Sequence, residues 1–304
     1  MMATWQEVLG AVLEAPGAVM MLGAVDVGKT TAATALATAA LRTGLRVAVV
    51  DTDSGQSSLG PPATVGLGIM RRPVRHMSEI PLVAARFVGD TSPAAVYAYL
   101  IDGAVRLMAR ARAQAEVIVV DTTGWVEGTA AVAAKVAKIV QIRPRHVIAI
   151  QRADEVEPIL ARLPCPLVVH RLRPPRNVRR RSRDERRAFR EQRFAQYFAA
   201  ARQVTLDVTA LPGDRPVRYA GRRISQARVL SEIPPRVLRH LLVGLAGPDE
   251  DLVALGIVAA VHPAARLVDV LAPAGSLAAV RTLQWGALRV APSGREEGRV
   301  RACA

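Results

Sequence analysis

An apolar run, a glycine-bearing loop and a helix-forming run follow one another directly within residues 18–43. AVMML at 18–22 predicts a buried strand, GAVDVGKT at 23–30 fits G-x-x-x-x-G-K-[ST], and residues 29–43 predict a helix rich in Ala and Thr. A loop at this position turns its backbone N–H groups toward phosphate oxygens at the positive end of the helix dipole. Because strand, loop and helix all occur where the pattern requires them, we predict that this segment binds a nucleoside triphosphate.

Two side chains of the loop are expected to bind the triphosphate and its metal ion, in addition to the backbone N–H groups. Lys29 is expected to reach the β- and γ-phosphates, and the Thr30 hydroxyl to bind Mg²⁺. ATP and Mg²⁺ are therefore the predicted cofactors. The residues expected to surround the phosphates are Gly23, Ala24, Val25, Asp26, Val27, Gly28, Lys29, Thr30 and Thr31.

Short apolar runs alternate with predicted helices through the first two thirds of the chain. The further predicted strands are 46–50, 81–89, 115–121, 146–150 and 166–170. This alternation predicts an α/β fold, a parallel sheet covered by helices on both faces. Ligands of such sheets bind at the carboxyl ends of the strands, where Asp51, Asp121 and Gln151 stand with the loop.

Length, hydropathy and cysteine content restrict the class of protein. The chain has 304 residues, of which 51% are hydrophobic, so we expect a globular protein. No apolar run reaches the length of a membrane span, and the N-terminal residues carry no basic leader, so neither a membrane anchor nor a signal peptide is predicted. Cys165 and Cys303 are too few for a disulfide framework, which favours a reducing, cytoplasmic compartment.

The positive charge is concentrated in one segment. Of the formal net charge of +15, about half falls within residues 171–193, which contain 11 Arg against three acidic residues. Such a block suits a polyanionic partner, either nucleic acid or a triphosphate. A GC-rich genome accounts for the choice of Arg over Lys, since Lys29, Lys135 and Lys138 are the only lysines, but it does not account for the clustering.

Two acidic residues follow the second predicted strand in DTDSGQSSLGPPATVGLG, residues 51–68. Transfer of a phosphoryl group to a hydroxyl requires metal ligands and a carboxylate that orients and deprotonates the acceptor. Asp51 and Asp53 stand two positions apart, so that one of them can face a metal ion and the other an acceptor. The alternative is that both are turn-forming residues of a polar loop.

A second strand-to-loop junction, VIVVDTTGWVEG at 117–128, has the Walker-B form. Asp121 is expected to hold Mg²⁺, directly or through water. Trp125 is either a stacking platform for a nucleotide base or a core aromatic that covers a helix end, and the sequence leaves both open.

The arginine block precedes a predicted helix that ends near FAQYF, and Arg186, Arg190 and Arg193 share one face of it. A solvated charged face is the ordinary explanation. A mobile lid that delivers arginines to a transferring phosphoryl group is the alternative. We expect a P-loop domain over 1–202, with this lid at about 171–198, and a small β-rich C-terminal domain over 203–304.

These motifs together resemble the polynucleotide 5′-hydroxyl kinases of tRNA splicing, pre-rRNA processing and mRNA 3′-end formation, especially the shorter archaeal members. The resemblance rests on GAVDVGKTT, the D-x-D-x-G-Q segment at 51–56 with the P-x-T-x-G loop after it, FVGDTSP at 87–93, DTTGWVEG, and the arginine-rich segment 179–198. The C-terminal LVALGIVAAVH region is similar to the small terminal domain of that family.

The resemblance implies a role for each matching residue. Asp53 is implied as the general base, Lys29 as a catalytic phosphate ligand, and Arg186 and Arg190 as lid arginines that clamp the phosphates. Thr30, Asp51 and Asp121 form the expected metal-binding set. The implied substrate-binding residues are Gln56 near the metal or nucleophile, Thr64 at the nucleic-acid backbone, Trp125 at the terminal nucleotide, and Arg181 and Arg193 in the lid.

The expected function is ATP-dependent transfer of the γ-phosphate to the 5′-hydroxyl end of RNA, DNA or both, in the cytoplasm and without a membrane partner. A catalytically silent ATP-binding scaffold of an RNA-processing complex is one alternative. A nucleotide-dependent switch or metal-insertion ATPase is another, although that class would more naturally carry a second P-loop lysine or Cys and His near the site. A small-metabolite kinase is disfavoured by the charge.

Overall fold

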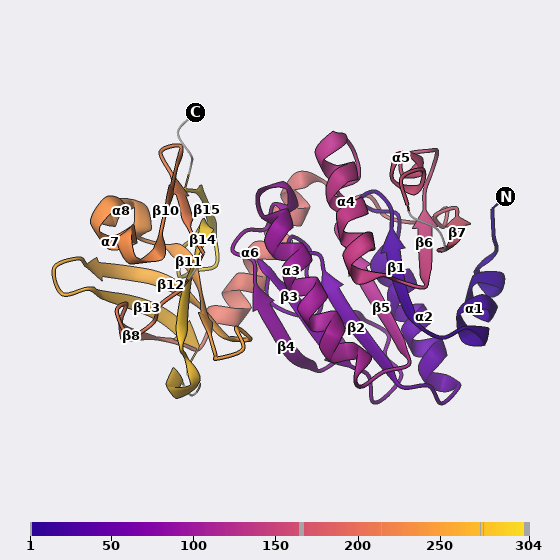
Figure 1. Ribbon diagram of the computed structural model, residues 1–304, viewed down its shortest axis with the longest axis horizontal. Coiled ribbons are helices and arrows are strands. Elements are labelled where there is room, and N and C mark those ends of the chain that lie inside the picture. The colour runs from indigo at the N-terminus through magenta and orange to yellow at the C-terminus, as the bar shows by residue number, and fades with distance from the viewer. Residues whose placement is uncertain (1, 164–166, 214, 274, 276, 301–304) are drawn as a thin grey trace. The chain divides into compact units, whose positions relative to one another are not determined.

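The computed structural model describes residues 2–163, 167–213, 215–273, 275 and 277–300 (Figure 1). Cys165 and Cys303, on which the predicted redox compartment depends, lie outside these residues. The chain forms two compact units. The first contains Met1–Gly60, Thr64–Ala85 and Ser92–Ser182, and the second contains Pro61–Ala63, Arg86–Thr91 and Arg183–Ala304.

A seven-stranded sheet of order β4-β3-β2-β5-β1-β6-β7 organises the first unit. Its strands are β1 Ala18–Leu22, β2 Val47–Thr52, β3 Thr64–Ile69, β4 Leu82–Phe87, β5 Val117–Thr122, β6 His146–Ile150 and β7 Val168–Leu172. β1 is parallel to β5 and β6, β2 to β5, and β6 to β7. The predicted parallel sheet is therefore confirmed.

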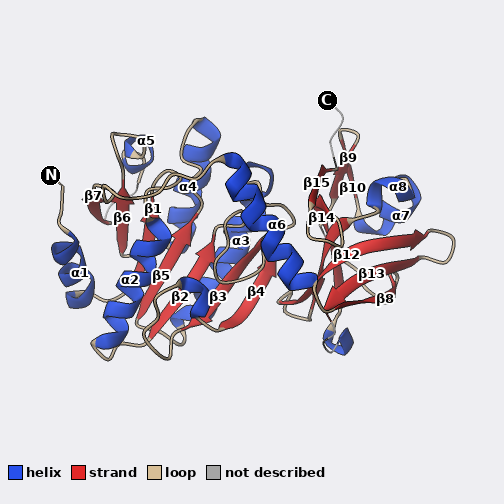
Figure 2. Ribbon diagram, turned by 180° about the vertical axis from the view of Figure 1, so that it is seen from behind, coloured by secondary structure: helices blue, strands red, loops and turns tan. Residues whose placement is uncertain are grey.

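Helices cover both faces of this sheet, as the predicted fold class requires (Figures 1 and 2). They are α1 Trp5–Glu14, α2 Lys29–Arg42, α3 Pro93–Arg112, α4 Thr129–Ile142 and the short α5 Glu157–Leu160, with a 3₁₀ turn at Met77–Glu79. One core joins α1 and α2 to alternate residues of the strands, including Val49 and Val119. The residues between them face the opposite side, where α3 and α4 contact each other.

β3 was not expected, because residues 51–68 read as a loop rich in Gly and Pro. The strand runs antiparallel to β2 and is buried along almost its whole length. Its glycines weaken the strand pattern but suit the close packing around it. A Cβ at Gly68 would lie 2.7 Å from Ile80 Cγ2, and one at Gly66 would lie 3.0 Å from Leu82 Cδ1. A close approach between segments, which no local pattern reveals, therefore favours glycine here.

The second unit contains an antiparallel sheet of order β15-β14-β11-β12-β13-β8, which confirms the predicted β-rich domain. Its strands are β8 Ala201–Asp207, β11 Leu241–Ala246, β12 Leu252–His262, β13 Leu267–Pro273, β14 Thr282–Val290 and β15 Glu296–Arg299. The remaining elements are α6 Arg183–Phe198, the hairpin β9 Val217–Tyr219 and β10 Arg222–Ile224, the short helices α7 Val229–Glu232 and α8 Pro235–Leu238, and 3₁₀ turns at Gln226–Arg228 and Leu277–Ala279.

The boundary between the units differs from the one expected at residue 202. α6 belongs to the second unit, because Phe194 and Phe198 share a core with residues of its sheet, including Leu242 and Leu255. The segment predicted as a lid, about 171–198, is therefore divided: β7 and the loop to Ser182 belong to the first unit and α6 to the second. The charge pattern indicates which face of α6 is exposed. It does not indicate where Phe194 and Phe198 pack.

Within the described residues, no helix has both the length and the apolar character needed to cross a membrane.

Replacement of Phe194 by Ala tests the assignment of α6. Phe194 is completely buried, and deletion of such a ring costs about 3–5 kcal/mol of unfolding free energy. We expect the variant to lose stability in urea and to exchange the amides of β11 and β12 faster. The control is Gln192→Ala, at an exposed position of the same helix. A loss below about 1 kcal/mol for Phe194→Ala would show that α6 is not part of this core.

Candidate active site

The P-loop connects β1 directly to α2, and its backbone requires glycine at two positions. Gly28 has φ 88° at the start of α2, and a Cβ at Gly23 would lie 2.4 Å from the Ile150 carbonyl oxygen. Lys29 is only 7% exposed, and its Nζ donates a hydrogen bond of 2.7 Å to the Ala24 carbonyl. The predicted phosphate-binding ammonium is thus folded back over the loop that it is expected to serve.

Asp26 joins the P-loop to two later segments of the first unit. Its Oδ2 accepts a hydrogen bond of 2.9 Å from the backbone N–H of Arg181, and its carbonyl accepts one from the Arg152 guanidinium. Asp26 itself has φ 53°, a conformation that Asp tolerates better than most residues. The loop that leads to α6 is therefore fixed to the P-loop through its backbone, while the Arg181 side chain is exposed.

Thr30 and Asp121, which the sequence placed in the metal-binding set, are in direct contact. The Thr30 hydroxyl donates a hydrogen bond of 2.5 Å to Asp121 Oδ2. Burial, together with the nearby Asp51, raises the pKa of the Asp121 carboxyl to about 7. A buried carboxylate and a hydroxyl at the phosphate-binding helix are suitable oxygen ligands for Mg²⁺, so these two residues fit the predicted ion.

The described residues contain no group of three or more His, Cys, Asp or Glu side chains that would hold a metal ion. Mg²⁺ commonly takes one or two protein ligands, with water and substrate phosphates completing its coordination shell. The pair Thr30 and Asp121 matches that mode of binding.

Asp51 lies beside Asp121 in the paired strands β2 and β5, but its carboxylate is already surrounded by donors. It accepts hydrogen bonds from the backbone N–H groups of Asp53, Ser58 and Leu59 at 2.9, 2.7 and 3.1 Å, and from the Ser57 hydroxyl at 3.2 Å. Burial nevertheless raises the pKa of this carboxyl. Asp51 thus shapes the loop that follows β2.

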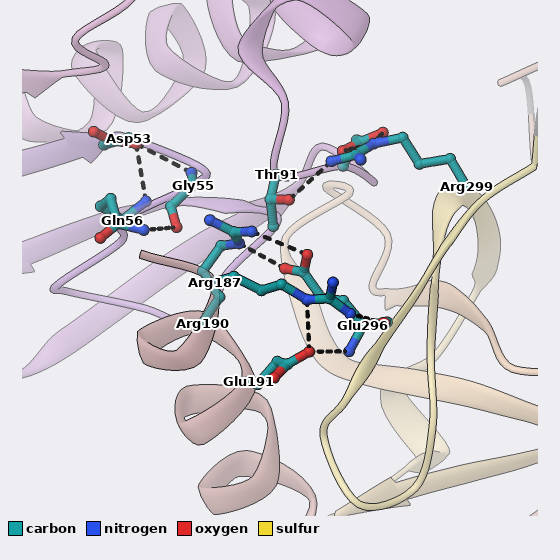
Figure 3. Close-up of polar contacts among 10 residues, drawn as sticks. Asp53, Gly55, Gln56, Thr91, Arg187, Arg190, Glu191, Glu296 and Arg299 are labelled. Carbon is teal, nitrogen blue, oxygen red and sulfur yellow. Dashed lines mark hydrogen bonds and ion pairs between the residues drawn. The ribbon is translucent and has the colours of Figure 1, made fainter. Parts of the chain in front are cut away.

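Asp53 has one carboxylate oxygen fixed by the loop and one without such a partner (Figure 3). Its Oδ1 accepts hydrogen bonds of 3.1 and 3.0 Å from the backbone N–H groups of Gly55 and Gln56. Within the described part of the chain, Oδ2 has no hydrogen-bond partner. The Gln56 side chain donates to the Gly55 carbonyl at 2.9 Å and so stays next to Asp53.

The Gly124–Trp125 pair follows the Walker-B strand and contacts the P-loop. A Cβ at Gly124 would lie 2.6 Å from the backbone nitrogen of Val25, so only glycine permits this approach. Trp125 is half-buried and lines a narrow crevice with Tyr97, Lys135 and Lys138, among others. Its ring is therefore neither fully exposed nor part of a described hydrophobic core.

Thr64 is fully buried at the start of β3. In this conformation its hydroxyl is not accessible to a nucleic-acid backbone, although the resemblance assigned it that role.

Of the arginines expected in the lid, Arg186, Arg190 and Arg193 lie on α6 in the second unit, and a carboxylate binds Arg190 (Figure 3). Arg190 makes a bidentate ion pair with Glu296, with Nε–Oε1 at 2.6 Å and Nη2–Oε2 at 3.0 Å. Arg187 binds Glu191 at 3.0 Å and the Glu296 carbonyl at 2.6 Å. Arg186 and Arg193 are half-buried on the same helix.

Sequence reasoning missed two lysines beneath the site and the partner of Arg190. Lys135 and Lys138 are almost completely buried on α4, and Glu296 is a buried partner of Arg190. A signal for the lysines was present, since they are two of only three lysines in a chain with 41 basic residues. Nothing local marks Glu296, because 106 positions separate it from Arg190.

The fold and the site define a P-loop nucleotide-binding protein with the components of a phosphotransferase. The chain belongs to the family described as mRNA cleavage and polyadenylation factor CLP1 P-loop, whose model matches residues 23–200. The resemblance found in the motifs is therefore confirmed at the level of the family.

Similar curated proteins include archaeal enzymes that match almost the whole chain. A polyribonucleotide 5′-hydroxyl-kinase of Pyrococcus furiosus is 28% identical over 325 residues, covering 94% of this chain and 91% of its own. One of Methanocaldococcus jannaschii is 28% identical over 324 residues, covering 93% and 90%. Among solved structures, the wild-type Clp1p–Pcf11p complex contains a chain with the same fold, with a TM-score of 0.66 at 12% identity, over 93% of this chain and 77% of that one.

The raised pKa of Asp121 predicts how stability and Mg²⁺ binding depend on pH. Without divalent cations, the folded state holds a proton that the unfolded state releases near pH 4, so stability should fall as pH rises from about 4 to 7. Mg²⁺ must displace that proton, and its affinity should therefore drop about tenfold per pH unit below 7. Melting temperatures in EDTA and in MgCl₂ between pH 5 and 8 measure both effects.

Asp121→Asn is the matched variant for this experiment, because it keeps the shape of the side chain without a titratable proton. In this variant the pH dependence of Mg²⁺ binding due to Asp121 should disappear, and the fall in stability should become smaller, because Asp51, whose pKa is also raised by burial, remains. If they persist unchanged, Asp121 is not the group responsible.

Proposed function

We propose that this protein transfers the γ-phosphate of ATP to the 5′-hydroxyl end of a polynucleotide, with RNA as an acceptor. The observation that carries the proposal is Asp53, whose Oδ1 is held by two backbone amides while Oδ2 is open. It stands two residues beyond the end-of-strand carboxylate Asp51, which pairs in register with Asp121. The names of the archaeal relatives, polyribonucleotide 5′-hydroxyl-kinases, support the same acceptor.

The donor half of the reaction uses the P-loop. Lys29 exchanges its contact with the Ala24 carbonyl for the β- and γ-phosphates, which are stronger acceptors for an ammonium. Thr30 and Asp121 would hold Mg²⁺, which supplies positive charge to the phosphates when bound. Asp51 keeps its four donors and supports the loop, so we assign it to loop geometry and Asp121 to the ion.

The acceptor half uses the loop that carries Asp53. Its Oδ2 accepts the proton of the attacking 5′-hydroxyl, while the two amides on Oδ1 keep the carboxylate in one orientation. Gln56 and the half-exposed ring of Trp125 are the groups that would contact the terminal nucleotide. Thr64 would reach the strand only if the buried start of β3 moved.

One observation favours the catalytically silent ATP-binding scaffold. Arg190, which the resemblance assigns to the phosphates, is held by both oxygens of the buried Glu296. If the protein is a kinase, either this ion pair opens during the reaction or Arg190 has only a structural role. In a scaffold, it need never open.

Label transfer from [γ-³²P]ATP to short 5′-hydroxyl oligonucleotides tests the kinase. With Mg²⁺ present, we expect labelled RNA, with DNA as a parallel acceptor. Asp53→Asn should lower kcat at least 100-fold and leave ATP affinity within about threefold, because the amide cannot accept the proton. A 5′-phosphorylated oligonucleotide is the control substrate and should remain unlabelled.

Tight ATP binding without transfer to RNA or DNA would reject the kinase and favour the scaffold. An Asp53→Asn variant with normal kcat would remove Asp53 as the base and direct attention to another proton acceptor.

Arg190→Ala and Glu296→Gln separate the two roles of the ion pair. If Arg190 serves the phosphates, Arg190→Ala should lower kcat at least tenfold, whereas Glu296→Gln should keep or raise it, because it weakens the restraint on the guanidinium. Thermal melting measures the structural share of each change, since breaking a buried pair costs about 3–5 kcal/mol. If both variants lose the same amount of stability and their folded fractions keep an unchanged kcat, Arg190 has only a structural role.

A further inference from the structure

All three lysines of the chain are buried in the first unit, around one end of its sheet. Lys29, Lys135 and Lys138 are 7%, 3% and 4% exposed. Lysine is among the side chains least often fully buried, and this chain otherwise uses arginine for its basic residues. Lys29 belongs to the P-loop, but the proposed reaction assigns no role to the other two.

α4 directs both remaining lysines toward the carboxyl ends of β2 and β5. They are three positions apart and therefore share a face of the helix. Lys138 Nζ donates a hydrogen bond of 3.0 Å to the Thr52 hydroxyl, and that hydroxyl donates one of 2.7 Å to the Asp121 carbonyl. Lys138 is thus connected, through one hydroxyl, to the backbone of the predicted metal ligand.

The strand register explains why lysines and carboxylates approach the same point from opposite faces. β2 and β5 pair Asp51 with Asp121 and Thr52 with Thr122. Side chains alternate along a strand, so the two aspartates face the P-loop while the two threonines face α4. The aspartates and the two lysines of α4 therefore approach the same ends of β2 and β5 from opposite faces of the sheet.

Lys135 has a complete set of acceptors at the end of β5. Its Nζ donates to the Thr122 hydroxyl, the Thr123 carbonyl and the Thr123 hydroxyl at 3.0, 2.6 and 3.2 Å. These match the three N–H donors of an ammonium group. Lys135 thereby fixes the turn that leads into Gly124 and Trp125.

Within the described residues, Lys138 makes one hydrogen bond, to Thr52, and its other polar interactions are with charges at longer range. Burial lowers its pKa to about 8, while Asp53, Asp51 and Asp121 all act to raise it. The ammonium is therefore in the field of all three carboxylates of the site. Three carboxylates close together repel one another strongly unless positive charge is nearby.

We propose that Lys138 is a positioning residue whose ammonium is a counter-charge of the Asp51, Asp53 and Asp121 cluster. It holds the carboxylates in place before a divalent cation binds, and it lowers the affinity of the site for that cation. The inference deepens the proposed function and rests on it only for the identity of the ion. The alternative is that Lys138 only fills space beneath the sheet.

Binding of Mg²⁺ alone distinguishes these roles, because removal of a counter-charge strengthens cation binding whereas a packing defect does not. With MgCl₂ as the probe and no nucleotide or oligonucleotide, we expect Lys138→Met to bind the ion about tenfold more tightly than the wild type. In EDTA the variant should melt at a lower temperature, and Mg²⁺ should restore more of that loss than it adds to the wild type. Calorimetric titration and thermal melting give the two readouts.

Three further variants separate charge from hydrogen bonding and from burial. Lys138→Gln keeps a donor for Thr52 without the charge and should behave like Lys138→Met, which also protects the test if Met fails to fold. Thr52→Val removes the hydrogen bond but keeps the charge, and should leave Mg²⁺ affinity within about twofold. Arg86→Met removes a buried, ion-paired cation of the second unit, and should lower stability without changing Mg²⁺ affinity.

Unchanged or weaker Mg²⁺ binding by both Lys138 variants would overturn the proposal and leave Lys138 as a packing residue. This outcome is independent of the kinase assay, because the titration contains neither ATP nor an acceptor. Conversely, the wild type could show no label transfer while Lys138→Met binds Mg²⁺ more tightly. That result would reject the kinase function and support the role of Lys138 as a counter-charge.

Discussion

The hydrogen bond between Thr30 and Asp121 is the contact on which the candidate site depends. It ties the first residues of the P-loop helix to the end of the central strand β5, and it brings together a hydroxyl and a carboxylate that suit one divalent cation. The loop geometry around it is enforced by close backbone approaches, at Gly23 against Ile150 and at Gly124 against Val25. The P-loop, the Thr30–Asp121 pair and the Trp125 turn are therefore in direct contact with one another.

Charge balance is the second constraint. Three carboxylates and three lysines meet around the ends of β2 and β5, with little exposure to water for most of them. Burial opposes the charged forms of Asp51, Asp121 and the three lysines, so these groups depend on their neighbours for stability. Asp51 meets this requirement with donors from its own loop, Asp121 with Thr30, and Lys135 with three oxygen acceptors. Asp53 keeps one oxygen open, which is the feature expected of a proton acceptor.

Much of this site follows from the sequence, because its components are local. The P-loop, the carboxylates at strand ends and the Gly-Trp turn each occupy a short, contiguous segment whose position on a strand, loop or helix can be read from hydrophobic periodicity. The features that escaped prediction are long-range contacts. β3 depends on glycines that pack against Ile80 and Leu82, α6 joins the second unit through Phe194, and Glu296 meets Arg190 across 106 positions.

The sequence by itself determined the family, the parallel sheet and the position of the P-loop between a strand and a helix, because these depend on short patterns and on the fixed alternation of side chains along a strand. Only the tertiary structure decided which carboxylate is left open, that α6 belongs to the second unit, and that two lysines lie beneath the acidic cluster. Those outcomes depend on which polar groups form hydrogen bonds and ion pairs in the protein interior. Such pairs form between segments that are far apart in the sequence.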